Sequence, residues 1–550
     1  MQMKKIIAAL TVSAMLLSGL GTGVYADSGA TAAVPAFTVT LNGQVVDNSY
    51  RQYPLLVYKD ITYFPMTYYD CRFLGIESTW KGSGEGLYIT ATGVSGAYDA
   101  YKGTAKNKRS YRVSIPTFPI TVNGVKVDNS KEEYPLLVFR DVTYFPMTWK
   151  WGVDNFNWAY SFNPESGLKI SSNASHVSQS AVLPNVETEI LEDGTNTDAA
   201  CYAAGYVYWR TTDGKIMQAP LSNVSSAKKI FQLPVWDEMP SKPLVYSHIV
   251  NVDGSAQLRY HTGAGVMGSD HRLNLQKDGK LCKIQGSYWV TEQIGNKLFA
   301  YWGSGDAGPG ELIVGTVPDA LTASELEAVT GKNPSISEFE EIGSEDYYYS
   351  GLSESGKQFA LYGDKLYLST AKFYLKDGTM AKEGFYLSYV DLKTGKTTVA
   401  ASEPCGEYCT AVAAGDYIYY MSGADCYRYD TNTEKDELIG TMSAVKDAYY
   451  LGVAGSSVYA AASKGALYKL GESQPVNKGA KVDGMKQTGE YLVCSFAETA
   501  SSQYRLMVFD ESGACVFKTA DKANINTVSV ENGTLYYYNY NFKTICSVPL

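Results

Sequence analysis

The residues best suited to metal chemistry are few and widely separated in this sequence. Cys405 and Cys409, in "EPCGEYCT", are the only cysteines that look locally pairable, but a zinc site needs two further ligands and no histidine lies near them. No two histidines have the strand spacing of a metal-binding pair. We therefore expect no metal site and no cofactor. The histidines are His176, His248, His261 and His271.

Motifs for catalysis are equally scarce. The sequence contains no Gly-x-Ser-x-Gly elbow, no His-Glu-x-x-His and no repeated Ser-x-Asp-x-Gly-x-Thr-Trp box. The carboxylates that recur lie at or beside turns, where they can accept hydrogen bonds from backbone donors. We expect no catalytic residue. The recurring carboxylates are Asp278, Asp391, Asp430 and Asp510.

An aromatic pair offers a different kind of site. Trp149 and Trp151, in "TWKWG", would face the same way in an extended segment, with Lys150 facing away. Such a pair can stack on sugar rings, although aromatic residues in strands more often belong to a core. We take a glycan platform at Trp149 and Trp151 as a hypothesis.

The composition indicates the elements that must position these residues. The chain has 550 residues, of which 45 are Tyr and 51 are Gly, a combination typical of short aromatic strands joined by tight turns. Its length predicts several domains, and we expect a mainly β fold. The net charge is −10 and the basic residues are scattered, which argues against nucleic-acid binding.

The first residues are typical of an export signal. Lys4 and Lys5 precede an apolar run from Ile6 to Leu20, and the small residues around Ala26 suit a signal peptidase. We expect residues 1–26 to be removed and the mature chain to start at Asp27. The predicted location is extracellular, secreted or held non-covalently on the cell wall, with no membrane span in the mature chain.

A duplication follows. "RQYPLLVYKDITYFPMTY" and "EEYPLLVFRDVTYFPMTW" match at an offset of 81 residues, and the match includes Asn42-Gly43 with Asn123-Gly124. Asn-Gly predicts a type I′ hairpin turn, and a second hairpin turns at Lys-Asp or Arg-Asp. "MTYYDCRFLG" predicts a short helix, and "IESTWKGSGEGLYIT" predicts a further strand pair.

This order of elements resembles the copper amine oxidase N-terminal-like domain, or stalk domain, of exported Gram-positive proteins. The resemblance covers residues 37–90 and 118–172, and Pro135, Arg140-Asp141 and Pro146 fit its pattern, whereas "MTWKWGVDNF" departs from it. The family name would imply copper chemistry, which needs three histidine ligands and an Asn-Tyr-Asp or Asn-Tyr-Glu precursor. Asn539-Tyr540-Asn541 lacks the carboxylate, so amine oxidation is set aside.

After a Ser-rich linker at 173–186, a glycine-led phrase recurs before apolar-aromatic strands, as in "YGDKLYLST" and "AAGDYIYYM". Its spacing fits four-stranded blades, so residues 187–550 are predicted to form a β-propeller of seven or eight blades. "ETEILEDG", at 187–194, offers a spare strand to close the ring. Thr322 and Glu325 predict a capped helix within a surface insertion. The glycines are Gly205, Gly254, Gly295, Gly363, Gly415, Gly455, Gly489 and Gly533.

The phrase is similar to that of a propeller family likened to the low-density lipoprotein receptor-related protein propeller (DUF5050-like), common in exported bacterial proteins. Together these observations predict an exported, non-enzymatic binding protein of the cell envelope. Two stalk modules would position a propeller that docks a wall glycan or a surface protein. A secreted propeller hydrolase or lyase and a purely structural spacer are the alternatives.

Overall fold

The structure is a computed structural model. It describes residues 25–550 except 94, 99, 157, 164–166, 173–176, 188–197, 236–245, 263–268, 285–289, 302–311, 330–339, 345, 351, 354–355, 358, 378, 408, 447, 478–479, 498–504, 520 and 541. Residues 1–24 of the predicted export signal lie outside this set. The chain divides into two compact units, residues 1–178 and 179–550, each of which is described by itself.

The first unit is built around a closed six-stranded barrel with two four-stranded sheets. The barrel order is β1 (Tyr25–Ala33), β4 (Leu56–Tyr58), β5 (Ile61–Pro65), β12 (Val142–Pro146), β11 (Leu137–Phe139) and β8 (Ser110–Pro116). One sheet has β10 (Val125–Val127), β9 (Ile120–Val122), β7 (Leu87–Ala91) and β6 (Ile76–Trp80). The other has β13 (Ala159–Asn163), β14 (Gly167–Ser171), β2 (Val39–Leu41) and β3 (Gln44–Val45).

The predicted hairpins and helix are confirmed. Asn42 and Gly43 both have positive φ, 44° and 80°, in the turn between β2 and β3, as a type I′ turn requires. The first copy has the expected helix α1 (Tyr68–Phe73), which Thr67 caps. The unit also contains the 3-10 helix η1 (Asn129–Lys131) and the π-helix η2 (Lys150–Asn155).

The two copies are related by an internal two-fold axis. In the barrel, Phe64 of β5 lies opposite Phe145 of β12, and these residues are one repeat length, 81 residues, apart. Thr31 of β1 lies opposite Arg112 of β8 with the same difference (112 − 31 = 81). An antiparallel pair of equivalent residues must lie on the axis that relates them, so the axis passes through both pairs.

The copies are intertwined through their outer sheets. Strand β9 of the second copy pairs in parallel with β7 of the first, with Ile120 opposite Leu87. The equivalent pair joins β2 of the first copy to β14 of the second, with Val39 opposite Leu168. The predicted segments 37–90 and 118–172 are therefore not separate folding modules, because each copy completes a sheet of the other.

A buried ion pair distinguishes the first copy from the second. The guanidinium of Arg51 donates to Asp70 at 2.6 Å, and both side chains are almost fully buried. In the second copy, Glu132 and Trp151 occupy the equivalent positions (51 + 81 and 70 + 81). The second copy therefore packs an indole where the first copy places a charge, and its helical segment is a π-helix instead of an α-helix.

The strand exchange predicts which glycines are intolerant of substitution. A Cβ on Gly86 would lie 1.8 Å from the carbonyl oxygen of Pro119, and one on its equivalent Gly167 would lie 1.9 Å from that of Thr38. Gly82 also has positive φ, but a Cβ built on it would have no atom within 4 Å. We expect Gly86→Ala and Gly167→Ala each to lower the free energy of unfolding by about 1–3 kcal/mol more than Gly82→Ala, as overpacking does.

Urea denaturation of the three variants measures this difference, and Gly82→Ala controls for the backbone strain that all three share. Equal losses in all three variants would contradict the exchanged pairing.

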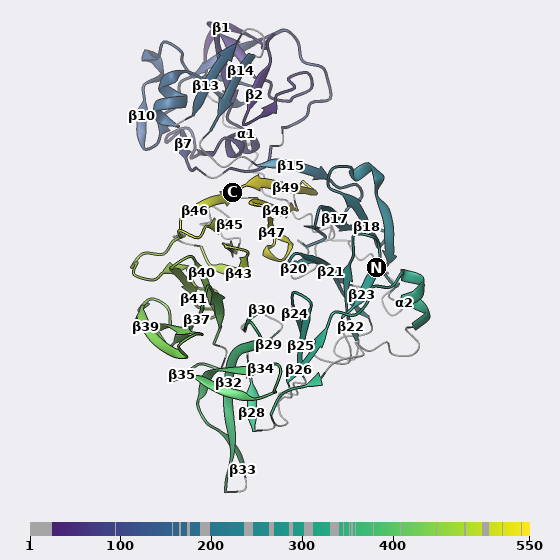
Figure 1. The fold of residues 1–550 in the computed structure, drawn as a ribbon. Helices are drawn as coiled ribbons and strands as arrows, with labels where there is room; N and C mark the ends of the chain where they lie inside the picture. Colours follow the sequence, from purple (N-terminus) through teal and green to yellow (C-terminus); the bar gives the residue numbers. More distant parts are fainter. Residues whose placement is uncertain are drawn as a thin grey trace, which may run out of the picture. The chain divides into compact units, whose positions relative to one another are not determined.

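The second unit consists of sheets that follow one another around a ring (Figure 1). The described residues of this unit form eight sheets of three or more strands, which we number as blades in chain order. Blade 1 has β16 (Ala200–Ala203), β17 (Tyr206–Arg210), β18 (Lys215–Pro220) and β19 (Lys228–Gln232). Blade 2 has β20 (Ser247–Val252), β21 (Ser255–Thr262), β22 (Ser269–Leu275) and β23 (Leu281–Lys283). Blade 3 has β24 (Val290–Ile294), β25 (Lys297–Tyr301), β26 (Leu312–Thr316) and β27 (Glu340–Glu341).

The next blades continue the pattern with one elaboration. Blade 4 has β28 (Tyr347–Tyr349), β31 (Ala360–Tyr362), β32 (Lys365–Lys376), β33 (Thr379–Lys382), β34 (Phe385–Asp391) and β35 (Thr397–Cys405). Blade 5 has β36 (Val412–Ala414), β37 (Tyr417–Ser422), β38 (Asp425–Asp430) and β39 (Lys435–Thr441). Figure 1 shows β32 and β33 extending outward from the ring.

The last blades bring the chain back to its start. Blade 6 has β40 (Tyr450–Ala454), β41 (Ser457–Ala461) and β42 (Tyr468–Lys469), and blade 7 has β43 (Val482–Thr488), β44 (Tyr491–Phe496), β45 (Leu506–Phe509) and β46 (Cys515–Thr519). Blade 8 has β47 (Ser529–Glu531), β48 (Thr534–Asn539), β49 (Thr544–Pro549) and β15 (Ser178–Val182). Smaller elements are β29 (Leu352–Ser353), β30 (Gly356–Lys357), α2 (Ala323–Val329), η3 (Val224–Ser226) and η6 (Ile525–Thr527).

Ring closure uses a different strand from the one expected. The outer strand of blade 8 is β15, Ser178–Val182, which adds to β49 near the end of the chain. This strand lies inside the predicted linker 173–186, whereas most of the predicted closing segment, 187–194, is outside the described residues. The predicted linker is therefore wrong from residue 178 onward, because its serines form a strand of the second unit.

The glycine-led phrase occupies the same position in every blade, at the turn after the innermost strand. All eight of its glycines have positive φ. Each glycine turns the chain from the innermost strand to the next strand, as Gly254 does between β20 and β21. Six of the eight blades have four antiparallel strands among the described residues, so the innermost strands of these blades run the same way through the ring. The unit therefore has one side that carries these turns and another at which the inner strands begin.

The predicted capped helix is also confirmed. The amide of Glu325 donates to the hydroxyl of Thr322 at 3.2 Å, and the amide of Thr322 donates back to the carboxylate of Glu325 at 2.8 Å, which is a capping box ahead of α2. No helix in the described part of the chain is long and apolar enough to cross a membrane.

Candidate functional site

The predicted pair of tryptophans does not form a shared platform. Residues 150–155 are helical and not extended, so Trp149 and Trp151 point in different directions. Trp149 is 67% exposed, whereas Trp151 is 4% exposed and packs against the ring of Phe145 with 5.0 Å between centroids. The hypothesis fails for Trp151, because the local helix carries its side chain into the core of the first unit.

The structure shows a second exposed aromatic ring, in the first copy, that the sequence did not indicate. Tyr68 is the equivalent of Trp149 in the first copy (68 + 81 = 149), and its side chain is 55% exposed. The guanidinium of Arg72 lies over the Tyr68 ring, 4.8 Å from its centroid. Each copy therefore exposes one aromatic ring at the start of its helical segment.

These environments predict opposite effects of two similar substitutions. Trp151→Ala removes a core side chain and should lower the free energy of unfolding by about 3–5 kcal/mol, while Trp149→Ala should change it by less than about 0.5 kcal/mol. Chemical denaturation of the two variants measures both. A large loss in Trp149→Ala would contradict its placement at the surface.

The two predicted pairable cysteines lie close enough to perturb each other's ionisation. The thiol of Cys409 donates a hydrogen bond to the sulfur of Cys405, which lowers the pKa of Cys405, whereas burial and the same contact raise the pKa of Cys409. The Cys405 sulfur also lies 3.6 Å from the hydroxyl of Ser369. Other cysteines, such as Cys201 and Cys494, are fully buried and their pKa values are raised by burial.

We expect Cys405 and Cys409 to form a disulfide on oxidation, because the two thiols interact and that interaction favours the Cys405 thiolate. The intact mass should fall by two hydrogen atoms, and peptide mapping should place the link between these two residues. The Cys405→Ser variant should keep its full mass under the same treatment. Alkylation of both thiols without prior reduction would contradict this prediction. Closing so short a loop adds about 2 kcal/mol of stability.

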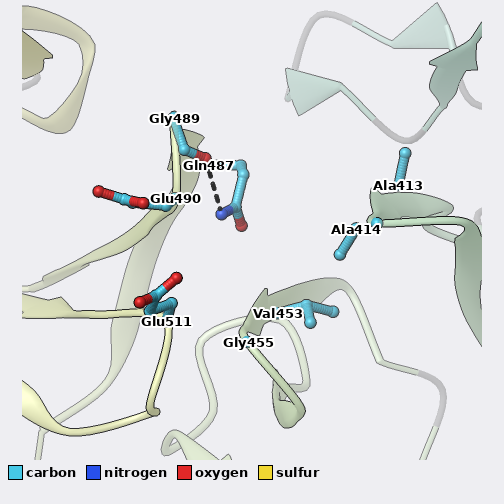
Figure 2. A pocket seen from close by; sticks show the side chains of 9 residues that line it. Ala413, Ala414, Val453, Gly455, Gln487, Gly489, Glu490 and Glu511 are labelled. Atoms are coloured by element: carbon cyan, nitrogen blue, oxygen red, sulfur yellow. Dashed lines mark hydrogen bonds between the residues drawn. The ribbon is translucent and has the colours of Figure 1, made fainter.

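A hollow lies on the side of the propeller that carries the glycine turns of blades 5, 6 and 7. It has a volume of about 280 Å³ and is lined by small groups such as Ala413 and Gly455 together with Gln487. Figure 2 shows Gln487 in the middle of the view, where its amide donates to the carbonyl of Gly489 at 3.3 Å. Glu490 and Glu511 lie on one side of it. The lining combines backbone and alanine with acidic groups, and it presents no cation.

A row of basic side chains crosses blade 2 at the other side of the ring. His248 of β20 lies directly opposite Arg259 of β21, which in turn lies opposite Arg272 of β22. Residues paired in this way project from the same face of a sheet, with Cβ atoms about 5 Å apart. These three residues, which we call the basic row, therefore form a continuous strip across three strands near the beginning of the inner strand.

Arg259, at the centre of the basic row, has an unusual environment. Burial and the positive charge of Arg272 lower the pKa of Arg259 to about 10, against the opposing effect of Glu292 and Asp198. Its Nε donates to the side-chain oxygen of Gln257 at 2.7 Å. Within the described residues, Arg259 forms no ion pair within 4 Å with a carboxylate.

The two ends of the basic row are each next to one acid. Glu292 of β24 in blade 3 lies 3.8 Å from the guanidinium of Arg272, and both side chains are largely buried. At the other end, the carboxylate of Asp198 lies 2.8 Å from Nδ1 of His248. Asp198 is 6% exposed and His248 is 33% exposed, so a buried carboxylate orients an accessible imidazole.

This arrangement can bind an anion and can hold a proton acceptor beside it. The guanidinium of Arg259 presents donors with no carboxylate partner among the described residues, and guanidinium groups match carboxylate and phosphate geometry. His248, held through Nδ1, leaves Nε2 for a ligand. Among the described serine, threonine and cysteine side chains, none is hydrogen-bonded to Nε2 of His248.

No motif in the sequence marks the basic row. One signal was available, since His248, His261 and His271 all fall within blade 2. His261 contacts Asp270 at 2.7 Å, and burial lowers the pKa of His271 to about 4. His176 is outside the described residues. The arginines gave no signal, because their proximity arises only when three strands pair.

The recurring carboxylates behave as predicted. Asp391 and Asp430 each accept backbone amides of their own turns, at 2.8–3.1 Å, and these bonds lower the pKa of both groups. Asp278 and Asp510 make the same contacts in other turns. No three His, Cys, Asp or Glu side chains among the described residues are grouped to hold a metal ion.

Comparisons with known proteins give structural similarity only. The sequence matches no protein-family model, and no curated protein is similar to it. A structure of BamB from Moraxella catarrhalis is 12% identical, covers 67% of this chain and 99% of its own, and has a TM-score of 0.37. The β-propeller domain of the Trilobed protease from Pyrococcus furiosus is 11% identical, covers 53% of this chain and 88% of its own, and has a TM-score of 0.32. The assignment of a β-propeller to the second unit rests on its own sheet order.

Proposed function

We propose that this chain is an exported, non-enzymatic binding protein of the cell envelope, and that its propeller docks an acidic wall polymer through the basic row of His248, Arg259 and Arg272. The observation that carries the proposal is the pair of adjacent guanidinium groups of Arg259 and Arg272. Like charges directly opposite one another destabilise a sheet. Such a pair is more readily explained by a bound anion than by a structural role.

The other parts of the proposal come from the sequence. The apolar run after Lys4 and Lys5 supports export. The resemblance of residues 37–90 and 118–172 to stalk domains supports a role for the first unit in holding the propeller near the cell surface. The exposed rings of Tyr68 and Trp149 give that unit two places for weak contact with sugars.

Retention on purified Gram-positive cell wall tests this function. The wild-type protein should be retained, and retention should fall with rising salt because charged contacts near a surface are screened. Arg259→Gln should weaken retention at least tenfold, whereas Arg428→Gln, on blade 5, should leave it unchanged. Arg428 is a suitable control because it is partly exposed, lies in another blade and is already paired with Glu437.

Two other outcomes would count against the proposal. Retention that disappears when surface proteins are stripped from the wall would identify a protein partner. The absence of retention on any wall fraction would favour a structural spacer.

A hydrolase or lyase is the second candidate, and one observation favours it. The buried Asp198 holds His248 in the orientation of a general base, next to arginines that can neutralise an anionic substrate. Release of soluble fragments from wall polymer by the wild type, with loss of release in His248→Ala, would support this activity.

A further inference from the structure

We infer that Arg259 and Arg272 of blade 2 form a specific binding site for an oxyanion, a carboxylate or a phosphate group, which both guanidiniums contact. The inference rests on the proposed binding function and names the chemistry of the ligand. A basic surface would bind only a charged polymer. This site is expected to bind a small anion, such as phosphate or acetate, on its own.

Arg259 and Arg272 place two positive charges next to each other in the sheet. Arg259 and Arg272 occupy directly opposed positions on neighbouring strands, so their side chains start about 5 Å apart on one face. Both are partly buried, with 12% of the Arg272 side chain exposed. Two cations held together out of water are costly unless an anion lies between or beside them.

The available acids do not supply that anion to Arg259. Asp198 is hydrogen-bonded to the imidazole of His248. Glu292 lies nearer to Arg272, and at 3.8 Å its contact is longer than a charge-assisted hydrogen bond. Among the described side chains, the hydrogen-bond acceptor of Arg259 is the neutral oxygen of Gln257.

A chain of hydrogen bonds between buried, uncharged side chains holds the acceptor of Arg259 in place. The amide of Gln257 donates to Asn274 at 3.1 Å, and Asn274 donates to Gln293 of blade 3 at 3.0 Å. These three side chains are buried, so the Gln257 oxygen that receives Nε of Arg259 is held in place. Arg259 is therefore oriented by its Nε, which leaves the outer edge of the guanidinium for a ligand.

His248 adds a third group to the same strip. Its Nδ1 is engaged by Asp198, and the remaining ring nitrogen is on a side chain that is 33% exposed. A ligand oxygen next to Arg259 would lie within reach of this nitrogen, because His248 is the cross-strand neighbour of Arg259. Two guanidiniums and one imidazole provide a set of donors suited to the oxygens of a carboxylate or phosphate.

Thermal unfolding of the full chain in the presence of inorganic phosphate or acetate tests the inference. Each anion is compared with sodium chloride at the same ionic strength. A ligand that binds only the folded state raises the unfolding temperature with its concentration. We expect one or both anions to raise it saturably in the wild type, and the two arms show whether phosphate or carboxylate is preferred.

Substitutions of Arg259 and Arg272 show whether the anion-dependent rise in unfolding temperature arises at this site. Arg259→Gln and Arg272→Gln should abolish the anion-dependent rise, Arg259→Lys should retain it with at least tenfold weaker apparent affinity, and Arg428→Gln should behave as the wild type. Circular dichroism shows whether each variant is folded. If Arg259→Gln does not fold, the comparison of Arg259→Lys with the wild type decides the question.

The inference is overturned if neither anion raises the unfolding temperature of the wild type beyond chloride, or if the rise persists unchanged in both Gln variants. The result is distinct from the test of the proposed function. Wall retention without an anion effect would preserve the function and exclude this site, whereas an anion effect without wall retention would preserve the site and exclude the wall ligand.

Discussion

Backbone pairing between β15 and β49 joins the beginning of the propeller unit to its end. Residues 178–182 supply the outermost strand of a sheet whose other three strands come from residues 529–549. Without this addition β49 would present an unpaired edge, and the first and last sheets of the ring would be joined only by side-chain packing. The fit of the last blade against the first depends on this closure, whereas the common direction of the inner strands follows from the number of strands in a blade and from the glycine turns.

That common direction gives the ring two chemically different sides. Glycine turns gather on one side, where the hollow in Figure 2 is lined by small residues and two acids. The basic row lies near the beginning of an inner strand and uses residues from three consecutive strands of blade 2. Blade 2 therefore carries charged groups and a chain of buried amides beside its apolar core.

Much of the fold could be predicted from local sequence. Asn42-Gly43 specifies a turn through backbone conformation alone, and Thr322 with Glu325 specifies a helix start through two reciprocal hydrogen bonds. The repeated glycine phrase predicted the inner turns of the blades for the same reason. Each of these signals depends on residues close together in the chain.

The rest required tertiary information. Ser178–Val182 has the composition of a linker, and it forms a strand because β49 offers it backbone partners. Trp149 and Trp151 were interpreted as an extended pair, but the second copy places a helical segment there and buries one of the rings. The basic row joins residues from 248 to 272 that share no motif, so its existence depends on strand register, which the sequence did not specify.

The exchanged sheets of the first unit have a consequence for its ancestry. The parallel pairings that join the outer sheets of the two copies recur at the repeat length, since Ile120 with Leu87 corresponds to Leu168 with Val39. Two unlinked chains carrying one copy each would satisfy the same bonds as a symmetric, strand-swapped homodimer. The covalent connection thus replaces association that depends on protein concentration with a fixed, high effective concentration. Once joined, the halves were free to diverge, as the exchange of Asp70 for Trp151 at equivalent positions illustrates.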